Sequence, residues 1–204
     1  MCSPSLEMSG KLPLILASAS PRRKQLLAEA GFVFETLPPD AHAEDHRRPN
    51  EPPADYVCRL AFQKAKNAAD KIERGIILGG DTIVLCGEDI LGKPIDRNDA
   101  RKMLQQLRGE THHVLSGLCL LKKEFGRKTT MLLETDITRL VMQSLSDDEI
   151  ESYLDTGKWR GKAGAFGYQD GNDWIVILEG SKSNVVGLPM ELFQTMYRTL
   201  EETV

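Results

Sequence analysis

Cysteine is scarce in this chain, and the few cysteines present are far apart. The 204 residues contain four of them, Cys2, Cys58, Cys86 and Cys119, and none belongs to a CxxC pair. This spacing is unlike that of zinc sites and gives no sign of a disulfide framework. We therefore expect the protein to work in the reducing cytoplasm.

Long apolar runs and an excess of positive charge are also missing. No stretch approaches the roughly 18 apolar residues of a membrane span, and residues 1–13 lack the apolar core of a signal peptide. The net charge is −4, from 26 basic and 30 acidic side chains. A general binder of nucleic acid or of membranes would need a basic surface. We therefore expect neither partner, and any local basic cluster suits a small anion.

The common nucleotide-binding and hydrolase motifs are absent as well. The glycines of GKAGAFG, residues 161–167, have the spacing GxxGxxG, which is neither the phosphate-loop nor the dinucleotide pattern. A hinge or substrate loop and a plain cluster of turns both fit this stretch. Ser18 and Ser20 have no convincing His and Asp partners for a catalytic triad. His112 and His113 would point to opposite faces of a strand and cannot share an ion.

What the chain does contain is a mixture of strand and helix patterns along its length. The patterns predict strands at 12–17, 32–37, 76–86, 113–121, 131–142 and 174–180. They predict helices at 21–30, 54–72, 96–107, 146–155 and 190–202. This mixture indicates an α/β protein with one domain over residues 11–204, built as two lobes. We expect residues 1–10 to form a disordered N-terminal tail.

Two arginines stand at the start of the first predicted helix, in the stretch LASASPRRKQLL. Ser20 suits the N-cap and the proline after it the first helical position, so Arg22 and Arg23 fall in the first turn. Positive charge is unfavourable there, because the helix dipole is already positive at that end. With Ser18 and the free backbone N–H groups, the two guanidiniums suit a phosphate. The alternative is that the arginines pair with surface acids such as Glu44.

Asp81 interrupts an apolar stretch, IILGGDTIVLC, that otherwise suits a central strand. A lone carboxylate there would carry a desolvation cost on the order of several kcal/mol unless it faced a cleft, a cation or donors. Gly79 and Gly80 before it would let another backbone or a ligand approach closely. The alternative is a strand that ends at Gly80, with Asp81 in an exposed bend. We favour a functional Asp81.

Two lysines and an acidic pair complete the candidates. Lys64 falls on the apolar stripe of its helix, where snorkelling alone would explain it. Lys93, in the LGKP corner, is equally ambiguous, and beside a phosphate either lysine would act as a compact positive charge. Glu44 and Asp45 are hard oxygen ligands of the kind that Mg²⁺ accepts, although an acidic pair in a loop is usually just solvated.

Taken together, the motifs resemble those of the Maf-like nucleoside triphosphate pyrophosphatases. The matching segments are collinear and run from about Leu14 to the C-terminus: LASASPRR, YVCRLAFQKA, GGDTIV, GKP, KAGAFGYQ and EGSKSNVVGLP. The resemblance implies an elongated α/β fold with a mixed sheet, related to the inosine triphosphate pyrophosphatases, and a cleft between two lobes. It implies hydrolysis of a nucleoside triphosphate between the α and β phosphates with a divalent metal, Mg²⁺, Mn²⁺ or Co²⁺. It also suggests a homodimer.

The resemblance implies a role for each candidate residue. The positions that match the family's phosphate-binding residues are Ser18, Arg22, Arg23, Lys64 and Lys93. Asp81 matches the proton acceptor and metal-site carboxylate, with Glu44 or Asp45 as a further metal ligand. We count Asp81 with the two lysines as the catalytic set. Arg22, Thr82 and Gln169 match positions associated with substrate preference.

The sequence of the glycine-rich loop indicates which substrate to expect. KAGAFGYQ looks like the KAGAYGIQ loop of the branch that acts on dTTP and UTP, and the amide of Gln169 can both donate to and accept from a pyrimidine edge. Three features of this chain differ from the motifs of that branch. They are Gly80, the glycine of GKP, and the pair Phe166 and Tyr168. The alternatives are the same reaction on 7-methyl-GTP, CTP or a damaged nucleotide, or a regulator of cell division that binds nucleotides without hydrolysing them.

Overall fold

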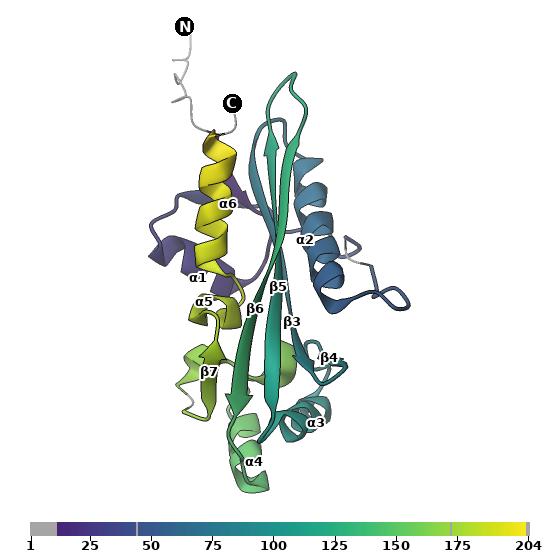
Figure 1. Cartoon of the computed structure of the whole chain (residues 1–204), viewed down its shortest axis with the longest axis vertical. Coiled ribbons are helices and arrows are strands. Elements are labelled where there is room, and N and C mark those ends of the chain that lie inside the picture. Colours follow the sequence, from purple (N-terminus) through teal and green to yellow (C-terminus); the bar gives the residue numbers. More distant parts are fainter. Residues whose placement is uncertain (1–11, 44, 172, 203–204) are drawn as a thin grey trace, which may run out of the picture.

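The structure is a computed structural model that describes residues 12–43, 45–171 and 173–202. A seven-stranded mixed sheet runs along the molecule, and helices pack on both of its faces (Figure 1). The strands are β1 (Leu14–Leu16), β2 (Phe34–Thr36), β3 (Gly75–Cys86), β4 (Asp89–Leu91), β5 (Thr111–Lys123), β6 (Thr130–Met142) and β7 (Ile175–Glu179). The α-helices are α1 (Pro21–Glu29), α2 (Pro53–Ala69), α3 (Arg97–Leu107), α4 (Asp147–Asp155), α5 (Lys182–Val186) and α6 (Met190–Glu202). Two short 3-10 turns are η1 (Ala163–Ala165) and η2 (Tyr168–Asp170).

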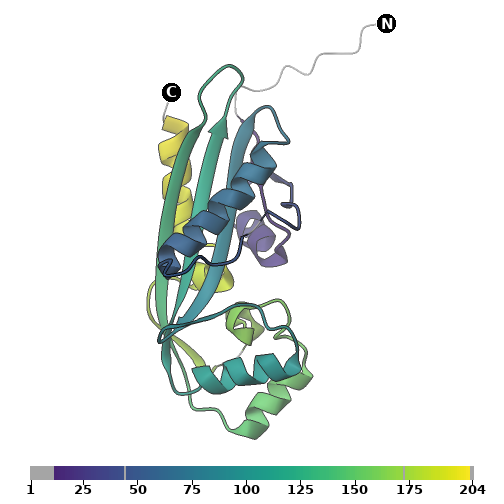
Figure 2. The same cartoon turned by 90° about the vertical axis from the view of Figure 1, so that its right-hand side faces the viewer.

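Three long antiparallel strands form the spine of the sheet. The strand order is β2-β1-β3-β5-β6-β7, with β4 paired to β3. β3, β5 and β6 extend through both ends of the elongated molecule (Figure 2). β1 and β2 run parallel to β3 at one end, whereas β4 and β7 pair antiparallel with the spine at the other. The same three strands therefore belong to both lobes.

The first lobe is a three-layer arrangement around the N-terminal half of β3. Helix α2 covers one face of the sheet, and α1 and α6 cover the other (Figure 1). On the α2 side the core consists mainly of small residues, such as Ala61 and Ala65, packed against Ile77. On the α6 side larger side chains, among them Phe193 and Leu78, fill the space. The small residues let α2 lie close to the sheet, which matters for the site below.

The second lobe forms around the other end of the spine. Helices α3 and α4 enclose a core whose fully buried members include Leu104, Leu107 and Ile150, together with Trp159 from the loop after α4. A capping box formed by Ser146 and Glu149 begins α4. The α/β class, the mixed sheet and the elongated two-lobed shape are confirmed.

Most predicted elements are present, with shifted ends. The predicted strand 76–86 corresponds to β3, and the predicted helix 54–72 ends three residues early, at Ala69. The three-residue β4 and the five-residue α5 were not predicted. The expected tail, residues 1–10, lies outside the described residues.

No helix in the described ranges is both long enough and apolar enough to span a membrane.

Candidate active site

A cavity of about 500 Å³ lies between the two lobes. Its wall comes from the start of α1, from α2, from the middle of β3, from the turn after β4, from the loop between α4 and β7, and from the end of α5. Eight residues singled out in the sequence line it: Ser18, Arg22, Arg23, Lys64, Asp81, Thr82, Lys93 and Gln169. Residues far apart in the chain thus face one space.

Arg23 is buried at the start of α1, where it links three segments of the chain. Ser20 caps this helix, and its hydroxyl accepts the backbone N–H of Arg23 at 3.5 Å. The Arg23 guanidinium donates to the Gly187 carbonyl at 2.8 Å, to Ser18 Oγ at 3.2 Å and to Thr82 Oγ1 at 3.3 Å. It therefore ties α1 to β3 and to the C-terminal end of α5, and it fixes the Ser18 and Thr82 hydroxyls in the cavity wall.

Arg22 reaches across the cleft to the second lobe. Its Nη2 donates to the Gly161 carbonyl at 2.9 Å. Burial lowers the pKa of Arg22, and the nearby carboxylate of Asp170 acts against that shift. Glu44, the surface acid considered as a partner of these arginines, lies outside the described residues. Arg22 and Arg23 donate to carbonyl and hydroxyl oxygens of the cavity wall.

Asp81 and Lys64 form an ion pair beside the sheet. β3 does not end at Gly80, because Asp81 stays in register with Gly117 of β5. Lys64 Nζ lies 2.6 Å from Asp81 Oδ1, and the two side chains are only 8% and 15% exposed. Lys64 therefore does not snorkel to solvent, and the carboxylate has the cation that its position required.

The glycine before Asp81 explains how α2 comes so close. A Cβ built on Gly79 would overlap the Ala61 carbonyl oxygen and lie 2.7 Å from the Ala65 backbone nitrogen. Opposite it, a Cβ on Gly117 would overlap the Val57 carbonyl and lie 2.6 Å from the Cys58 nitrogen. Helix α2 thus rests directly on the backbone of β3 and β5. The close backbone approach expected at this glycine pair is made by α2, at Gly79.

The second lobe contributes Lys93 and the glycine-rich loop. Lys93 follows β4, and the backbone N–H of Gly164 donates to the Gly92 carbonyl at 3.0 Å. This bond joins the LGKP corner to the loop that carries Gln169. On the first lobe, the Thr82 hydroxyl pairs with Ser116 Oγ at 2.8 Å.

Of the acidic pair expected to bind a metal, the structure describes Asp45, and this residue does not line the cavity. Asp45 accepts from Gln63 Nε2 at 2.5 Å and lies 3.8 Å from Arg59, and it is not among the lining residues. Glu44 lies outside the described residues. Within the described part of the chain, the carboxylates that line the cavity are those of Asp81 and Asp40. Hydrogen bonds from Lys71 and Asn67 lower the pKa of Asp40.

Three charged lining residues were missed by sequence reasoning: Asp40, Arg160 and Lys162. Asp40 stands in a polar, proline-punctuated loop where nothing marks one acid above its neighbours. Arg160 and Lys162 flank Gly161 in the glycine-rich loop, which sequence spacing left open between a substrate loop and simple turns. A pair of cations around that glycine was the available signal.

The oxygen donors in the cavity suit a metal only in part. Among the described residues no group of three His, Cys, Asp or Glu side chains is placed to hold an ion. Asp81 and Asp40 offer hard carboxylate oxygens, and Mg²⁺ is commonly bound by one or two carboxylates together with substrate phosphates and water. Asp81 and Asp40 could therefore supply only part of the ligand set of such an ion.

A family model described as Maf-like protein matches residues 13–200. The chain belongs to the Maf family. A relative in Rhodopirellula baltica, named dTTP/UTP pyrophosphatase, is 44% identical over 93% of this chain and 82% of its own length. Another of that name in Ruminiclostridium cellulolyticum is 38% identical over 94% of this chain and 97% of its own. The solved structure of the Ham1 protein of Staphylococcus aureus overlaps 92% of this chain and 98% of its own, at 9% identity and with a TM-score of 0.47.

Proposed function

We propose that this Maf-family protein is a nucleoside triphosphate pyrophosphatase acting on dTTP and UTP. The observation that carries the proposal is the single cavity in which Asp81 and Lys64 face the arginines of α1 and the Gln169 loop. Relatives at 38–44% identity that bear the name dTTP/UTP pyrophosphatase support the choice of substrate.

The charge of the cavity suits a polyphosphate. Among the residues that the structure describes, six cations and two carboxylates line it. The cations are Arg22, Arg23, Lys64, Lys93, Arg160 and Lys162, and the carboxylates are Asp40 and Asp81. This local excess of positive charge is found in a chain whose net charge is −4. Guanidinium groups match phosphate oxygens in two-pronged geometry, and lysines add compact charge. A triphosphate would offset the repulsion among these cations.

The reaction would be attack of water on the α phosphorus. The α–β phosphoanhydride bond breaks, pyrophosphate leaves with the bonding electron pair, and the water oxygen stays on the monophosphate. Asp81 would take the proton of that water, and Lys64 would stabilise the negative charge that develops on the phosphates. A divalent cation bound with the substrate would polarise the phosphoryl group and lower the pKa of the water. Asp81 would serve as its ligand or as the proton acceptor, two roles that compete for the same oxygens.

Gln169 supports a pyrimidine substrate. It lines the cavity from η2, and its amide can donate to and accept from the O4/N3 edge of thymine or uracil. Phe166, from the same loop, adds an aromatic wall. A cytoplasmic location and a homodimer, both expected from the sequence, stay predictions.

The test is pyrophosphate release from a panel of nucleoside triphosphates. The full-length protein is incubated with dTTP, UTP, CTP, GTP, ATP and 7-methyl-GTP, with Mg²⁺, Mn²⁺, Co²⁺ or excess chelator. Metal-dependent release that is fastest with dTTP and UTP is the expected result. Faster release from CTP or 7-methyl-GTP would overturn the substrate assignment. Tight dTTP binding without release would replace the enzyme by a nucleotide-binding regulator.

A further inference from the structure

A buried ion pair closes the glycine-rich loop on itself. Lys162 Nζ contacts both carboxylate oxygens of Asp170 and lies 2.5 Å from Oδ1. The two side chains are only 10% and 8% exposed. The hydroxyl of Tyr153, on α4, donates to Asp170 Oδ2 at 2.9 Å. Asp170 thus joins the two ends of the segment 162–170 and anchors it to the core of the second lobe.

The backbone inside this segment is shaped around the ion pair. A Cβ built on Gly167 would overlap Lys162 Nζ and lie 2.6 Å from Asp170 Oδ2, so the pair passes directly against the Gly167 backbone. Gly164 and Ala165 follow one another with φ of 66° and 62°. Ala165 has a side chain, and the left-handed region is unfavourable for it, so surrounding contacts must hold the loop in this form.

The closed segment presents its residues to the cavity. The members that line it are Lys162, Ala163, Phe166, Gly167 and Gln169. Asp170 is not among the lining residues, so it does not reach the substrate space itself. It stands directly after Gln169 and in contact with Lys162, and any effect on a substrate would pass through these two.

The charge of Asp170 also acts on two of the cations at this end of the cavity, Lys162 and Arg22. Burial lowers the pKa of Lys162, and the positive charge of Arg22 lowers it further, while Asp170 acts in the opposite direction. Burial likewise lowers the pKa of Arg22, again against the influence of Asp170. One carboxylate therefore offsets the repulsion between two neighbouring cations that come from different lobes.

We propose that Asp170 is a positioning residue for nucleotide recognition. It holds Lys162 at the cavity wall and closes the 162–170 loop, so that Gln169 meets the base and Lys162 meets the phosphates in fixed positions. The proposal deepens the proposed function and rests on it. In this proposal Asp170, which does not line the cavity, sets the affinity of the site for the nucleotide and its preference for the base.

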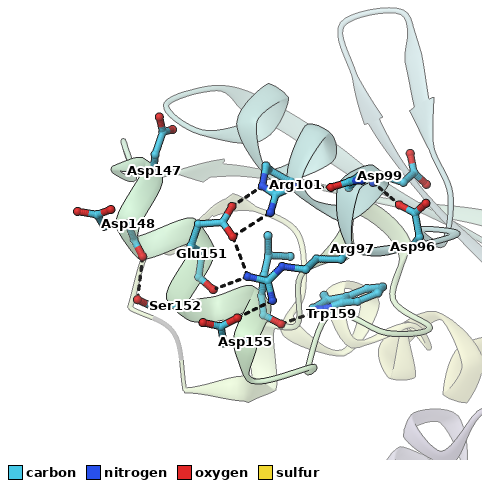
Figure 3. Close-up of polar contacts among 12 residues, drawn as sticks. Asp96, Arg97, Asp99, Arg101, Asp147, Asp148, Glu151, Ser152, Asp155 and Trp159 are labelled. Atoms are coloured by element: carbon cyan, nitrogen blue, oxygen red, sulfur yellow. Dashed lines mark hydrogen bonds and ion pairs between the residues drawn. The ribbon is translucent and has the colours of Figure 1, made fainter.

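The test compares Asp170→Asn with Asp155→Asn, the same chemical change at a control position in the same lobe. Asp155 pairs with Arg97 at 2.5 Å, is 72% exposed and does not line the cavity (Figure 3). Asp170→Asn is expected to raise KM for dTTP about tenfold with a smaller change in kcat, and to reduce the preference for dTTP over GTP. Asp155→Asn is expected to leave KM and preference unchanged. Equal KM and preference in wild type and Asp170→Asn would overturn the proposal.

Tyr153→Phe provides a milder variant in case Asp170→Asn does not fold. It removes only the hydroxyl that donates to Asp170, and the ring keeps its edge-to-face contact with Trp174, whose centroid lies 5.3 Å away. A smaller rise in KM in the same direction is expected. An unchanged KM in this variant, with Asp170→Asn unfolded, would also count against the positioning role.

Two readouts separate this proposal from the proposed function, because neither needs turnover. Amide hydrogen exchange over residues 161–169 should be faster in Asp170→Asn than in wild type and Asp155→Asn. The two tryptophans of the chain, Trp159 and Trp174, belong to the packed core around this loop, so their fluorescence can follow dTTP binding. Wild type that binds dTTP without releasing pyrophosphate would refute the proposed function alone. Unchanged exchange and equal dTTP affinity in Asp170→Asn would refute the positioning role alone.

Discussion

At the scale of single residues, the ion pair between Asp81 and Lys64 accounts for the burial of both charged side chains. A carboxylate in an apolar strand pattern was visible in the sequence, and so was the need for a counter-charge. Its partner was not, because Lys64 looks like an ordinary snorkelling lysine until α2 is placed on the sheet. The 2.6 Å ion pair is a tertiary contact between residues 17 positions apart. Sequence patterns indicate that Asp81 is unusual, but which charged residue lies beside it depends on how the helix packs on the strand.

Asp81→Asn should lower turnover of pyrophosphate release from dTTP about a hundredfold or more, because it removes a charge-stabilising or proton-accepting group. The amide oxygen of asparagine still accepts from Lys64, so the fold should be retained. Steady-state kinetics measure the effect, and the melting temperature serves as the control. Turnover near that of wild type in a folded variant would remove Asp81 from the mechanism.

At the scale of elements, the contact of α2 with β3 and β5 brings Lys64 to Asp81. The helix lies so close because glycines stand on both strands beneath it, at Gly79 and Gly117. The apolar stripe of α2, to which Val57 and Leu60 belong, is the face that is buried. The stripe could not predict how near the helix would come, because that depends on which residue of each strand lies beneath the helix. The register of β3 with β5 decides this.

Gly79→Ala should destabilise the protein by about 3 kcal/mol, because its Cβ would push α2 away from the sheet. Catalysis should fall as well, since Lys64 would move with the helix. Gly92→Ala is the matched control, because a Cβ there meets nothing within 4 Å. Denaturant unfolding of both variants measures the difference. If Gly79→Ala were as stable as Gly92→Ala, the close helix contact would be wrong.

Helices α3 and α4 are joined by an ion-pair network that centres on Glu151. Its carboxylate accepts from Arg97 at 2.7 Å and from Arg101 at 2.9 Å, and Arg97 also reaches Asp155 (Figure 3). Hydrogen bonds from Arg101, and then from Arg97, lower the pKa of Glu151 from 4.5 to about 2. The network thus braces the outer wall of the second lobe, away from the cavity.

The stability that Glu151 adds should depend on pH in one direction. Because its pKa is lower in the folded state, the contribution is complete above about pH 4.5 and is lost as the pH falls towards about 2. Glu151→Gln should therefore lower the melting temperature by about 1–3 °C at pH 7, with little difference from wild type near pH 2. Glu88→Gln, in an exposed turn, is the control. A gap between wild type and Glu151→Gln that widened on acidification would contradict the assignment.

The sequence did not indicate two of the short elements, β4 and α5. β4 has three residues and α5 has five, too few to show a period of two or of 3.6. The ends of the longer elements also differ by a few residues from the predicted ones, and in β5 the cause is pairing with a neighbour, which extends the strand beyond its apolar pattern. β5 thus begins at Thr111, opposite Val141 of β6, although the apolar pattern begins only at His113.

At the scale of the whole molecule, the cavity exists because two lobes share one set of strands. Its lining runs from Ala17 to Gly187, so nearly the full chain is needed to assemble it. The helix start at Arg22 and the loop at Gly161 meet across the cleft through one hydrogen bond. Local sequence patterns carry no information about such a meeting. Here the collinear set of family motifs supplied what the individual patterns lacked.

A ligand bound in such a cleft should stabilise both lobes together. At a concentration 100-fold above its dissociation constant, dTTP should add about 2.7 kcal/mol, which corresponds to a rise in melting temperature of about 5–10 °C. Thymidine lacks the phosphates that the six cations would meet, so it should give a much smaller rise. Because the contacts are ionic, the effect of dTTP should shrink as salt shortens the screening length from about 10 Å at 0.1 M to about 3 Å at 1 M. Equal stabilisation by dTTP and thymidine, or a rise that salt leaves unchanged, would mean that the cationic wall of the cleft does not hold the phosphates.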